Sequence, residues 1–495
     1  MNARRSGAGP IAVLVVVALL PALLLWSIYR WSDSKVADAA DAVPLLDSIP
    51  GGSAPVEAVA PQPALSTTLL SLRRSAEQLS LDLNMAAFDA AVVPLLNSVN
   101  DRSCVAVSLN GQMVGERNAT TVVIPASNQK LIVAATAVEI LGPEFHYTTN
   151  LVGAAPVGGV VNGDVYLVGG GDPLLSGKWY PGSNLDRFAA FNITPLDDLA
   201  ASLAASGVTQ ITGVVRGDGS RYDDEFYAPG WGEGVQGLEA GPYDALLVND
   251  SRVLGDDQRG ADPSEAGARE FVRLLSENGI SVTGGSGTGS APQGATVLAT
   301  LDSLPIAAAI EEMLTNSDNN TAELMVKEIG LATSGTGTRK AGLEAIATTV
   351  RTWGVDTAGM VLTDGSGLSL ENRITCATLI GVLRHVGGDS PIGQGMAVAG
   401  RTGTLVDIFG DTPLAGRLRG KTGTLNNPPF DQDPPAVKAL SGYLPIDGGG
   451  AIEYVLILNG PTISDQSEYR SVWGELVTAL ASFPAVASPA ALGPR

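Results

Sequence analysis

The chain is poor in the residues on which several common kinds of catalytic site depend. In 495 residues it has two cysteines, Cys104 and Cys376, and two histidines, His146 and His385. The histidines are 239 residues apart and no Gly-x-Ser-x-Gly motif occurs, which argues against a Ser-His-Asp hydrolase. Both cysteines lie in apolar patterns, so a disulfide and two buried free thiols stay open as alternatives. Neither a metal site nor a cofactor is expected.

Basic residues are also scarce. The chain has 30 Lys and Arg against 51 Asp and Glu, which gives a formal net charge of −21. No block of Lys or Arg occurs beyond the N-terminus, so binding of nucleic acid has little support. The acidic balance fits a soluble ectodomain.

The longest apolar run lies near the N-terminus, from Ile11 to Tyr29. At a rise of about 1.5 Å per residue it spans about 29 Å, roughly the hydrocarbon core of a bilayer. Residues 1–10, which carry two arginines, then stay in the cytoplasm, and the bulk of the chain lies outside, which predicts a single-pass protein of the cell membrane. The alternative is a secreted protein, released by signal cleavage at residues 37–39. Residues 30–66 are interpreted as a linker.

The next part of the chain predicts a helix, a hairpin and a second helix. Helical periodicity runs through residues 67–99. Two alternating runs, residues 103–109 and 112–117, are joined by an Asn-Gly pair that suits the tight turn of a β-hairpin. An apolar helix is then predicted from Ser127 to Leu141, where a Gly-Pro pair ends it.

From about residue 147 short alternating runs are separated by Gly, Asp and Pro, which predicts a largely β insertion. The runs expected as strands are residues 160–167, 213–217 and 245–249. A Gly- and Ser-rich stretch at residues 284–294 marks the return to the main domain. We therefore expect one domain built from residues 67–148 and 299–485, an inserted domain at residues 149–298, and a tail at residues 486–495.

Helical patterns resume after residue 300, and two strands and a helix complete the chain. The expected helices cover residues 305–314, 321–331, 339–353, 374–385 and 464–483, and the expected strands cover residues 437–444 and 452–459. No internal repeat is visible.

Ser127 and Lys130 are the strongest candidates for a catalytic pair. Because they are three residues apart at the start of an apolar helix, their side chains can meet on one helix face. The free N–H groups of a helix N-terminus would also stabilise negative charge formed at Ser127. A second Ser-x-x-Lys, at Ser32 and Lys35, lies in a polar segment without an apolar helix after it. The first copy therefore indicates a serine nucleophile with a lysine base.

Two further short motifs follow in chain order, Ser317-Asp318-Asn319 and Lys421-Thr422-Gly423. Taken singly, the first is compatible with a plain helix cap and the second with a strand that ends in a turn. Residues 416–422 also come close to a phosphate-binding loop, but three residues separate the glycines instead of four. The succession of the three motifs is far more specific than any one of them.

Together the three motifs resemble the signature set of penicillin-recognising serine enzymes. Their finer context is similar to the class C low-molecular-mass penicillin-binding proteins, which are D-alanyl-D-alanine carboxypeptidases and endopeptidases of the bacterial cell wall. The resemblance covers residues 69–483. It is carried by Pro-Ala-Ser-Asn-Gln-Lys at 125–130, Gly-Gly-Gly-Asp-Pro at 169–173, Asn-Ser-Asp-Asn-Asn at 316–320, Asp-Gly-Ser-Gly-Leu-Ser at 364–369 and Gly-Lys-Thr-Gly-Thr-Leu at 420–425.

The resemblance implies an α/β (α+β) transpeptidase-like, β-lactamase-like domain. In this fold an antiparallel sheet has helices on both faces and the nucleophile helix at its centre; a mostly β inserted domain and the N-terminal transmembrane helix complete the expected chain. The resemblance also implies a serine-type D-Ala-D-Ala carboxypeptidase, with endopeptidase activity left open. Such an enzyme acts on peptidoglycan stem peptides and is acylated by penicillins and other β-lactams. Because 190 residues separate Ser127 from Ser317, we expect a shorter insertion than in the largest members.

Residue roles follow from the same resemblance. Ser127 would attack the penultimate D-Ala carbonyl and Lys130 would be its base; burial and nearby cations, of which Lys421 would be one, would lower the pKa of Lys130. Ser317 would relay a proton to the leaving amine, and Asn319 would hydrogen-bond the substrate amide. The oxyanion hole would be formed by the backbone N–H groups of Ser127 and Thr424. The terminal carboxylate would be received by Lys421, Thr422 and the turn after them. The substrate-binding residues would be Asp318, Thr422, Gly423 and Thr424.

Several alternatives stay open. The same motifs occur in β-lactamases, which deacylate penicillin quickly, although we find no convincing deacylating Glu near the middle of the chain. A transpeptidase is a further option, and a catalytically silent wall-binding scaffold would keep the fold without the activity. Residues 401–404, Arg-Thr-Gly-Thr, nearly repeat residues 421–424. The pair of strands predicted after Lys421 favours Lys421 as the functional copy.

Overall fold

A six-stranded antiparallel sheet organises the catalytic part of the protein. The computed structural model describes residues 76–484 except 233, 257, 427–434 and 448, and the predicted membrane segment, the linker and the Ser32–Lys35 pair therefore lie outside the described residues. The strand order is β13-β14-β15-β16-β1-β2. The strands are β1 (Cys104–Leu109), β2 (Gln112–Arg117), β13 (Ala397–Val398), β14 (Arg419–Leu425), β15 (Ala436–Pro445) and β16 (Ala451–Gly460).

The predicted hairpin is confirmed, since β1 and β2 pair antiparallel across a tight turn. Asn110 and Gly111 both have positive φ, 50° and 76°, which is the conformation that the two central residues of this turn require. Every residue of β1 and of β16 is buried, although both strands belong to an antiparallel sheet. Strands buried on both faces need a covering layer on each side.

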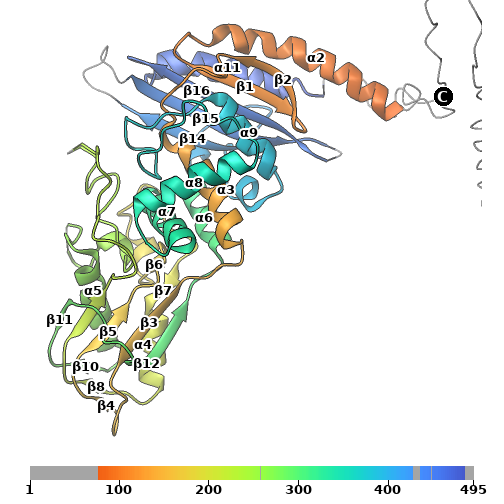
Figure 1. The fold of residues 1–495 in the computed structure, drawn as a ribbon. Coiled ribbons are helices and arrows are strands. Elements are labelled where there is room, and N and C mark those ends of the chain that lie inside the picture. Colours follow the sequence, from red (N-terminus) through yellow and green to blue (C-terminus); the bar gives the residue numbers. More distant parts are fainter. Residues whose placement is uncertain (1–75, 233, 257, 427–434, 448, 485–495) are drawn as a thin grey trace, which may run out of the picture. The chain divides into compact units, whose positions relative to one another are not determined.

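Helices supply both covering layers (Figure 1). On one face α2 (Ala76–Ser98) and α11 (Gln466–Ala481) pack against alternate strand residues such as Val105 and Val107. The other face is covered by α3 (Lys130–Leu141), α6 (Ile306–Asn316), α7 (Asn319–Ser334), α8 (Arg339–Thr352) and α9 (Cys376–Val386). The expected sheet with helices on both faces is thus present. Among the described residues, no helix is long and apolar enough to cross a membrane.

A disulfide joins the sheet to this second layer. Cys104 on β1 and Cys376 at the start of α9 are bonded, and their Cα atoms are 5.9 Å apart. Of the two alternatives that the sequence leaves open, the disulfide is therefore the one observed. It closes a separation of 272 residues and lies in the same apolar cluster as the nucleophile helix α3.

The inserted region, which we define as residues 148–302, contains a second sheet of five strands in the order β11-β9-β5-β3-β12 and a three-stranded sheet in the order β10-β8-β4. Its elements include β3 (Thr148–Gly153), β4 (Val160–Val161), β5 (Val165–Val168), α4 (Leu196–Ala205), β8 (Gln210–Ile211), β9 (Val215–Asp218), α5 (Pro263–Glu277), β10 (Ser281–Val282), β11 (Ser286–Thr288) and β12 (Thr296–Asp302). Because β12 pairs antiparallel with β3, the region closes at residue 302 rather than at the expected residue 298. The described residues from 76 to 484 all belong to one compact unit, so the division into domains stays a prediction.

Two α-helices, α4 and α5, accompany the expected strands of this region and cover its larger sheet; α5 begins with Asp262 as a cap and Pro263 in its first turn. One expectation for this region is wrong. The run at residues 245–249 forms no strand. Its alternate residues join two apolar clusters, Leu246 in one and Leu247 in the other, so burial on both sides explains the apolar pattern without strand pairing.

The nucleophile helix also begins later than expected. Residues 126–129 form a 3₁₀ turn, and the α-helix starts at Lys130 rather than at Ser127. Ala126 has a φ of 48°, and Gly367 lies so close that a Cβ on it would be 2.0 Å from the Ala126 carbonyl oxygen. This tertiary contact, which local sequence does not encode, accompanies the tighter turn that carries Ser127.

Candidate active site

Ser127 and Lys130 meet as their spacing predicts. Lys130 is fully buried, and its Nζ lies 2.9 Å from Ser127 Oγ. The same nitrogen lies 2.7 Å from Asn319 Oδ1 and 2.6 Å from the backbone oxygen of Ser366. Contacts with three oxygens fix the orientation of the Lys130 side chain. In its neutral form the Lys130 amine carries a lone pair that can accept the Ser127 proton.

Burial lowers the pKa of Lys130 from 10.5 to about 8, although the carboxylates of Asp318, Asp364, Glu323 and Glu239 oppose this shift. Of the two expected causes, burial therefore lowers the pKa of Lys130 and the charge of Lys421 does not. Burial also lowers the pKa of Lys421, and there the charge of Lys130 adds to the effect. Removal from water disfavours the charged form of a lysine, so burial in the low-dielectric site increases the neutral fraction of Lys130.

The junction of α6 and α7 presents the second motif. Ser317 has a left-handed backbone, with φ 68°, and ends α6. Asp318 caps α7 by accepting a hydrogen bond from the Thr321 N–H at 2.6 Å. The interpretation of this motif as a helix cap is thus correct. It is compatible with a catalytic role, because the cap directs Asn319 towards Lys130 and Ser317 towards Lys421. Burial raises the pKa of Asp318 to about 6.

The third motif lies in the middle of β14 rather than at a strand end. Lys421 is fully buried, and its Nζ donates to Ser317 Oγ at 2.8 Å and to the Thr422 carbonyl at 2.7 Å. The choice of Lys421 over Arg401 agrees with these contacts, because residues 403–405 form a separate 3₁₀ turn. A Cβ on Gly423 would approach Asn128 Nδ2 to 3.0 Å, so glycine lets β14 pack closely against the serine turn.

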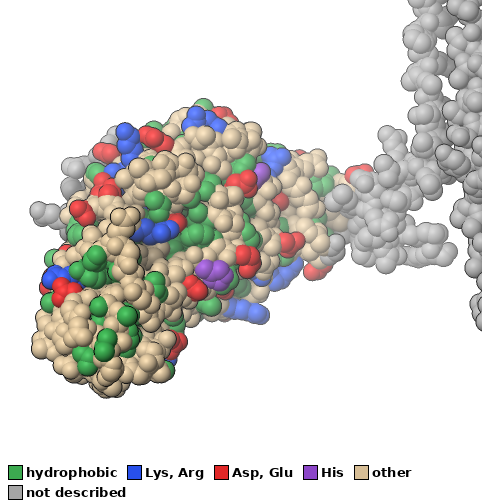
Figure 2. Space-filling model, turned by 60° about the horizontal axis from the view of Figure 1, so that its bottom comes forward, with side chains coloured by type: hydrophobic (Ala, Val, Ile, Leu, Met, Phe, Trp, Pro, Cys, Tyr) green, Lys and Arg blue, Asp and Glu red, His purple; other side chains and the backbone are tan. Residues whose placement is uncertain are grey.

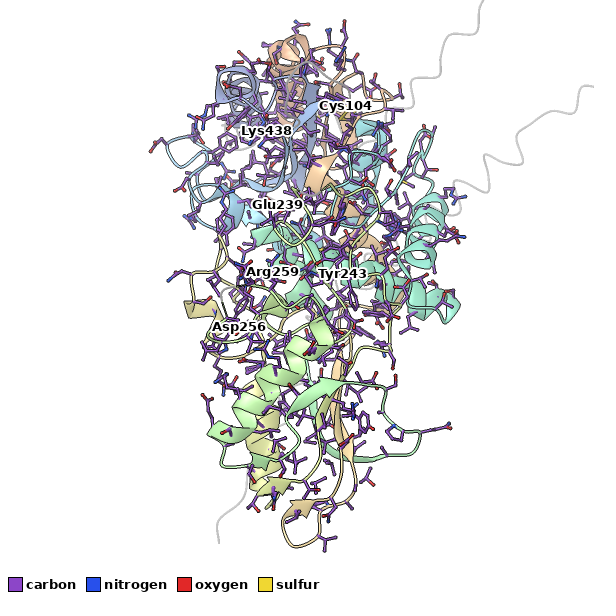
Figure 3. All side chains as sticks on the ribbon, turned by 90° about the vertical axis from the view of Figure 1, so that its left-hand side faces the viewer. Cys104, Glu239, Tyr243, Asp256, Arg259 and Lys438 are labelled. Atoms are coloured by element: carbon purple, nitrogen blue, oxygen red, sulfur yellow. A yellow bond between two sulfur atoms is a disulfide. The ribbon has the colours of Figure 1, made fainter. Side chains whose placement is uncertain are left out.

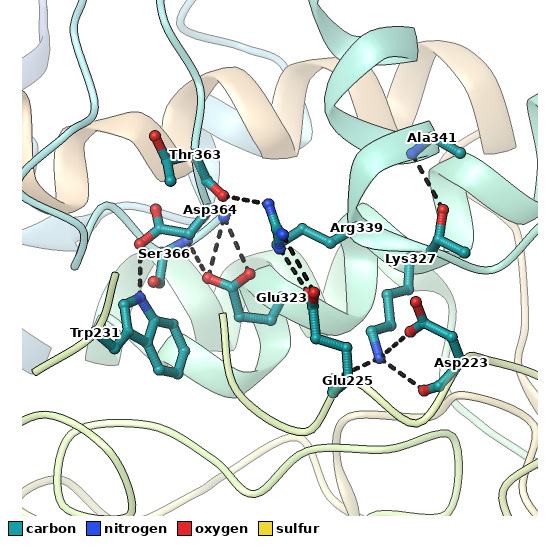
Figure 4. Close-up of polar contacts among 12 residues, drawn as sticks. Asp223, Glu225, Trp231, Glu323, Lys327, Arg339, Ala341, Thr363, Asp364 and Ser366 are labelled. Carbon is teal, nitrogen blue, oxygen red and sulfur yellow. Dashed lines mark hydrogen bonds and ion pairs between the residues drawn. The ribbon is translucent and has the colours of Figure 1, made fainter. Parts of the chain in front are cut away.

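Sequence reasoning missed a group of residues next to Lys130, and Figure 4 shows the contacts of Glu323, Asp364 and Ser366 within this group. Glu323 accepts the N–H groups of Gly365 at 3.0 Å and of Ser366 at 2.7 Å, and this turn presents the Ser366 carbonyl to Lys130. Asp364, in the same turn, accepts from Trp231 Nε1 at 2.8 Å. The available signal was an acidic residue four positions after Asn319 in an apolar helix, hence on the same helix face.

Glu323 and Asp364 form a buried acidic pair near Lys130. Burial, and then the charge of Asp364, raises the pKa of Glu323 to about 7. Further out, Arg339 pairs with Glu225 at 2.6 Å and Lys327 with Asp223 at 2.7 Å (Figure 4). The pairs at Lys327 and Arg339 link the inserted region to α7 and α8, and the Trp231 contact links it to the turn at Asp364.

A cavity of about 680 Å³ opens over these residues. One wall comes from the motifs and the other from the inserted region, which also supplies the Glu239 carbonyl that accepts from Asn319 Nδ2 at 2.8 Å. Of the predicted site residues, all except the buried Lys130 and Lys421 and the backbone-only Gly423 line this space. Its lining includes Ser127, Ser317, Asp318, Asn319, Thr422 and Thr424 together with Tyr180, Arg187, Glu239 and Arg252.

The histidines take no part in the site. His146 Nδ1 contacts the Ser303 carbonyl at 2.7 Å, and His385 stacks on Trp353 with ring centroids 4.3 Å apart. Within the described part of the chain, no cluster of three His, Cys, Asp or Glu could hold a metal ion. On the face seen in Figure 2, acidic and basic side chains are interspersed rather than gathered in one basic area.

Comparison with known proteins agrees with the geometry. A carboxypeptidase of Mycolicibacterium smegmatis, DacB, is 28% identical over 480 residues, which cover 93% of this chain and 95% of the relative. A D-alanyl-D-alanine carboxypeptidase of Actinomadura sp. is 28% identical over 452 residues, which cover 74% of this chain and 79% of the relative. Penicillin binding protein 4 (dacB) of Haemophilus influenzae, a solved structure, is similar with a TM-score of 0.62 at 20% identity, covering 78% of this chain and 99% of that chain.

The likeness to the H. influenzae structure shows that the two proteins share a fold. The profile of the D-Ala-D-Ala carboxypeptidase 3 (S13) family matches residues 97–256 and 247–481, which is most of the chain. The resemblance drawn from the motifs is thereby confirmed, and the chain belongs to the D-Ala-D-Ala carboxypeptidase 3 (S13) family of serine-type carboxypeptidases.

Proposed function

We propose that Ser127 is the nucleophile that this enzyme uses to cleave peptidoglycan stem peptides ending in D-Ala-D-Ala. Ser127 Oγ attacks the carbonyl carbon of the penultimate D-Ala while Lys130 takes the hydroxyl proton. The C–N bond then breaks, Ser317 relays the proton from Lys130 to the departing D-Ala amine so that Lys130 is neutral again, and an ester remains on Ser127. The observation that carries this proposal is the 2.9 Å contact between Lys130 Nζ and Ser127 Oγ in a fully buried setting.

Water then attacks the ester, with Lys130 again as the base, and the shortened peptide leaves with a free carboxylate. The N–H groups of Ser127 and Thr424 would stabilise the oxyanion in both steps. Asn319 would hold the substrate amide. One of its two amide N–H groups already donates to the Glu239 carbonyl, which leaves the other for a substrate oxygen.

The terminal carboxylate of the substrate would lie against β14, near Lys421, Thr422 and Thr424. An anion there favours the charged form of Lys421, opposing the burial that lowers its pKa. Thr422 and Thr424 line the cavity and can donate hydroxyl hydrogen bonds, whereas Gly423 contributes close packing. Asp318 caps α7, so its contribution to binding is to hold Ser317 and Asn319 in place.

We place this activity outside the cytoplasm, at the cell membrane through residues 11–29 or, after signal cleavage, in a secreted form. The substrate is found there, and the disulfide between Cys104 and Cys376 suits an oxidising compartment. The net charge of −21 does not favour an anionic partner such as nucleic acid. β-Lactams would acylate Ser127 because their strained amide presents a carbonyl to the same nucleophile.

The proposal is tested by labelling the protein with a fluorescent penicillin and following the adduct. We expect a stable adduct that is lost in Ser127→Ala and kept in the matched control Ser32→Ala. Rapid turnover of the adduct would instead indicate a β-lactamase, and no adduct on folded protein would indicate a silent scaffold. Assays with a D-Ala-D-Ala pentapeptide and with a cross-linked dimer then separate carboxypeptidase from endopeptidase activity by the product released.

A further inference from the structure

Lys438 is a cation beside the cavity to which the known chemistry of the motifs gives no role. It lies on β15 directly opposite Thr424 of β14 in the antiparallel register, so both side chains project from the same face of the sheet. Lys438 Nζ donates a hydrogen bond to Thr424 Oγ1 at 3.0 Å. Figure 3 labels Lys438 in the sheet, on the same side of the view as Glu239.

Two aromatic rings of α11 hold the Lys438 ammonium in place. Its Nζ lies 4.4 Å from the ring centroid of Tyr469 and 5.4 Å from that of Trp473. These rings pack edge to face, with centroids 4.8 Å apart. A cation over aromatic faces is stabilised by the ring quadrupoles, so this arrangement fixes the ammonium in a half-buried position. Burial, and then the charges of Arg187 and Arg470, lowers the pKa of Lys438.

The direction of this hydrogen bond decides what Thr424 can do. A threonine hydroxyl has one proton and two lone pairs, and the Lys438 ammonium has protons only. Thr424 must therefore accept from Lys438, and its own proton stays available for another acceptor. Thr424 is exposed and lines the cavity, so that acceptor is whatever anionic group the cavity receives.

We propose that Lys438 is a positioning residue for the substrate carboxylate: it orients the Thr424 hydroxyl so that its proton points into the cavity, and it polarises that hydroxyl. This inference rests on the proposed placement of the terminal carboxylate at Thr424. Lys438 acts through Thr424 and does not touch the reacting atoms. Its contribution is to binding of the carboxylate end, and the chemistry at Ser127 stays unaltered.

A double-mutant cycle on the full chain tests this proposal. The variants are Thr424→Val, Lys438→Met and the combination, with Lys340→Met as the matched control, because Lys340 is an exposed lysine on α8 away from the cavity. Methionine keeps an apolar stem against Tyr469 and Trp473 and removes the charge and the donor. The assay is the release of D-Ala from a D-Ala-D-Ala peptide, with kcat and KM measured separately.

We expect Lys438→Met to raise KM about tenfold with kcat within about twofold, and Lys438→Arg, which keeps a cation and a donor, to restore most of the binding. The combined variant should resemble Thr424→Val alone, because Lys438 has nothing to orient when the hydroxyl is gone. Lys340→Met should match the parent enzyme.

The outcomes distinguish the proposed placement of the carboxylate at Thr424 from the proposed role of Lys438. If Thr424→Val leaves KM unchanged, the proposed placement of the carboxylate is wrong. If Thr424→Val raises KM but Lys438→Met does not, the role of Lys438 is refuted while that placement stands. Fully additive effects, or a loss in kcat alone, would also refute it, because they would mean that Lys438 acts independently of the Thr424 hydroxyl.

Discussion

The acylation rate of the enzyme should depend on pH through Lys130. With a pKa of about 8, roughly a tenth of Lys130 is neutral at pH 7, against about 0.03% for a lysine with its ordinary pKa of 10.5. Burial thus raises the population of usable base about 300-fold. Because the neutral form is the base, activity is lost as pH falls through the folded-state pKa. The second-order rate of acylation by a penicillin should be about 100-fold lower at pH 6 than on its plateau above pH 8.

Stopped-flow measurement of acylation between pH 6 and 9.5 gives this profile for the free enzyme. The Glu323→Gln variant sharpens the test, since the carboxylate of Glu323 favours the charged form of Lys130. Its neutralisation should move the inflection to lower pH by roughly half a unit to one unit. Glu277→Gln, at an exposed position of α5 in the inserted region, serves as the control and should leave the inflection in place. A profile that is flat across this range, or one with an inflection near 10.5, would refute the role of Lys130 as base.

Two further perturbations follow from the same geometry. Lys421→Ala removes the partner of Ser317 Oγ and a cation near β14, so kcat/KM for D-Ala-D-Ala peptides should fall by at least about 100-fold in steady-state assays, and an unchanged value would exclude the carboxylate role. Replacing Cys104 and Cys376 together by Ala should lower the free energy of unfolding by about 2–5 kcal/mol, because the bond closes a 272-residue separation. In thermal melts a reductant should lower the midpoint of the parent protein and leave that of the double variant unchanged. If the parent and the variant have the same midpoint without reductant, the disulfide does not stabilise the fold as predicted.

The motif residues could be identified from sequence because each motif is short and its chemistry is local. A separation of three residues between Ser127 and Lys130 is enough to bring a hydroxyl and an amine together at the start of a helix. The cap at Asp318 is likewise a local signal, and it explains how Ser317 and Asn319 are turned into the site. That three such stretches form one cavity depends on the fold, and the family resemblance supplied that step.

What sequence reasoning missed depends on contacts between distant segments. The Ser366 carbonyl reaches Lys130 across 236 residues, and the Glu239 carbonyl reaches Asn319 across 80 residues. Backbone carbonyls carry no residue-specific signal, so no pattern predicts such contacts. The pairing of Cys104 with Cys376 was open for the same reason, since sequence does not reveal proximity.

Three predictions about individual helices and strands failed for different reasons. Helix α5 carries a start signal, Asp262 followed by Pro263, but the Gly, Asp and Pro residues around it favour strands and turns. The apolar alternation at residues 245–249 came from burial against two clusters, which periodicity alone does not distinguish from a strand. The 3₁₀ turn at Ser127 depends on the close approach of Gly367, a tertiary effect on a helix start.

The central claim is that one serine, Ser127, carries the acyl group. The most direct measurement is peptide mapping by mass spectrometry after brief exposure of the full chain to penicillin, with an acid quench to trap the ester. The account predicts a single adduct on the peptide that contains Ser127, which is absent in Ser127→Ala and strongly reduced at pH 7 in Lys130→Met. An adduct on Ser317 or at another site, or labelling that persists in Ser127→Ala, would contradict it.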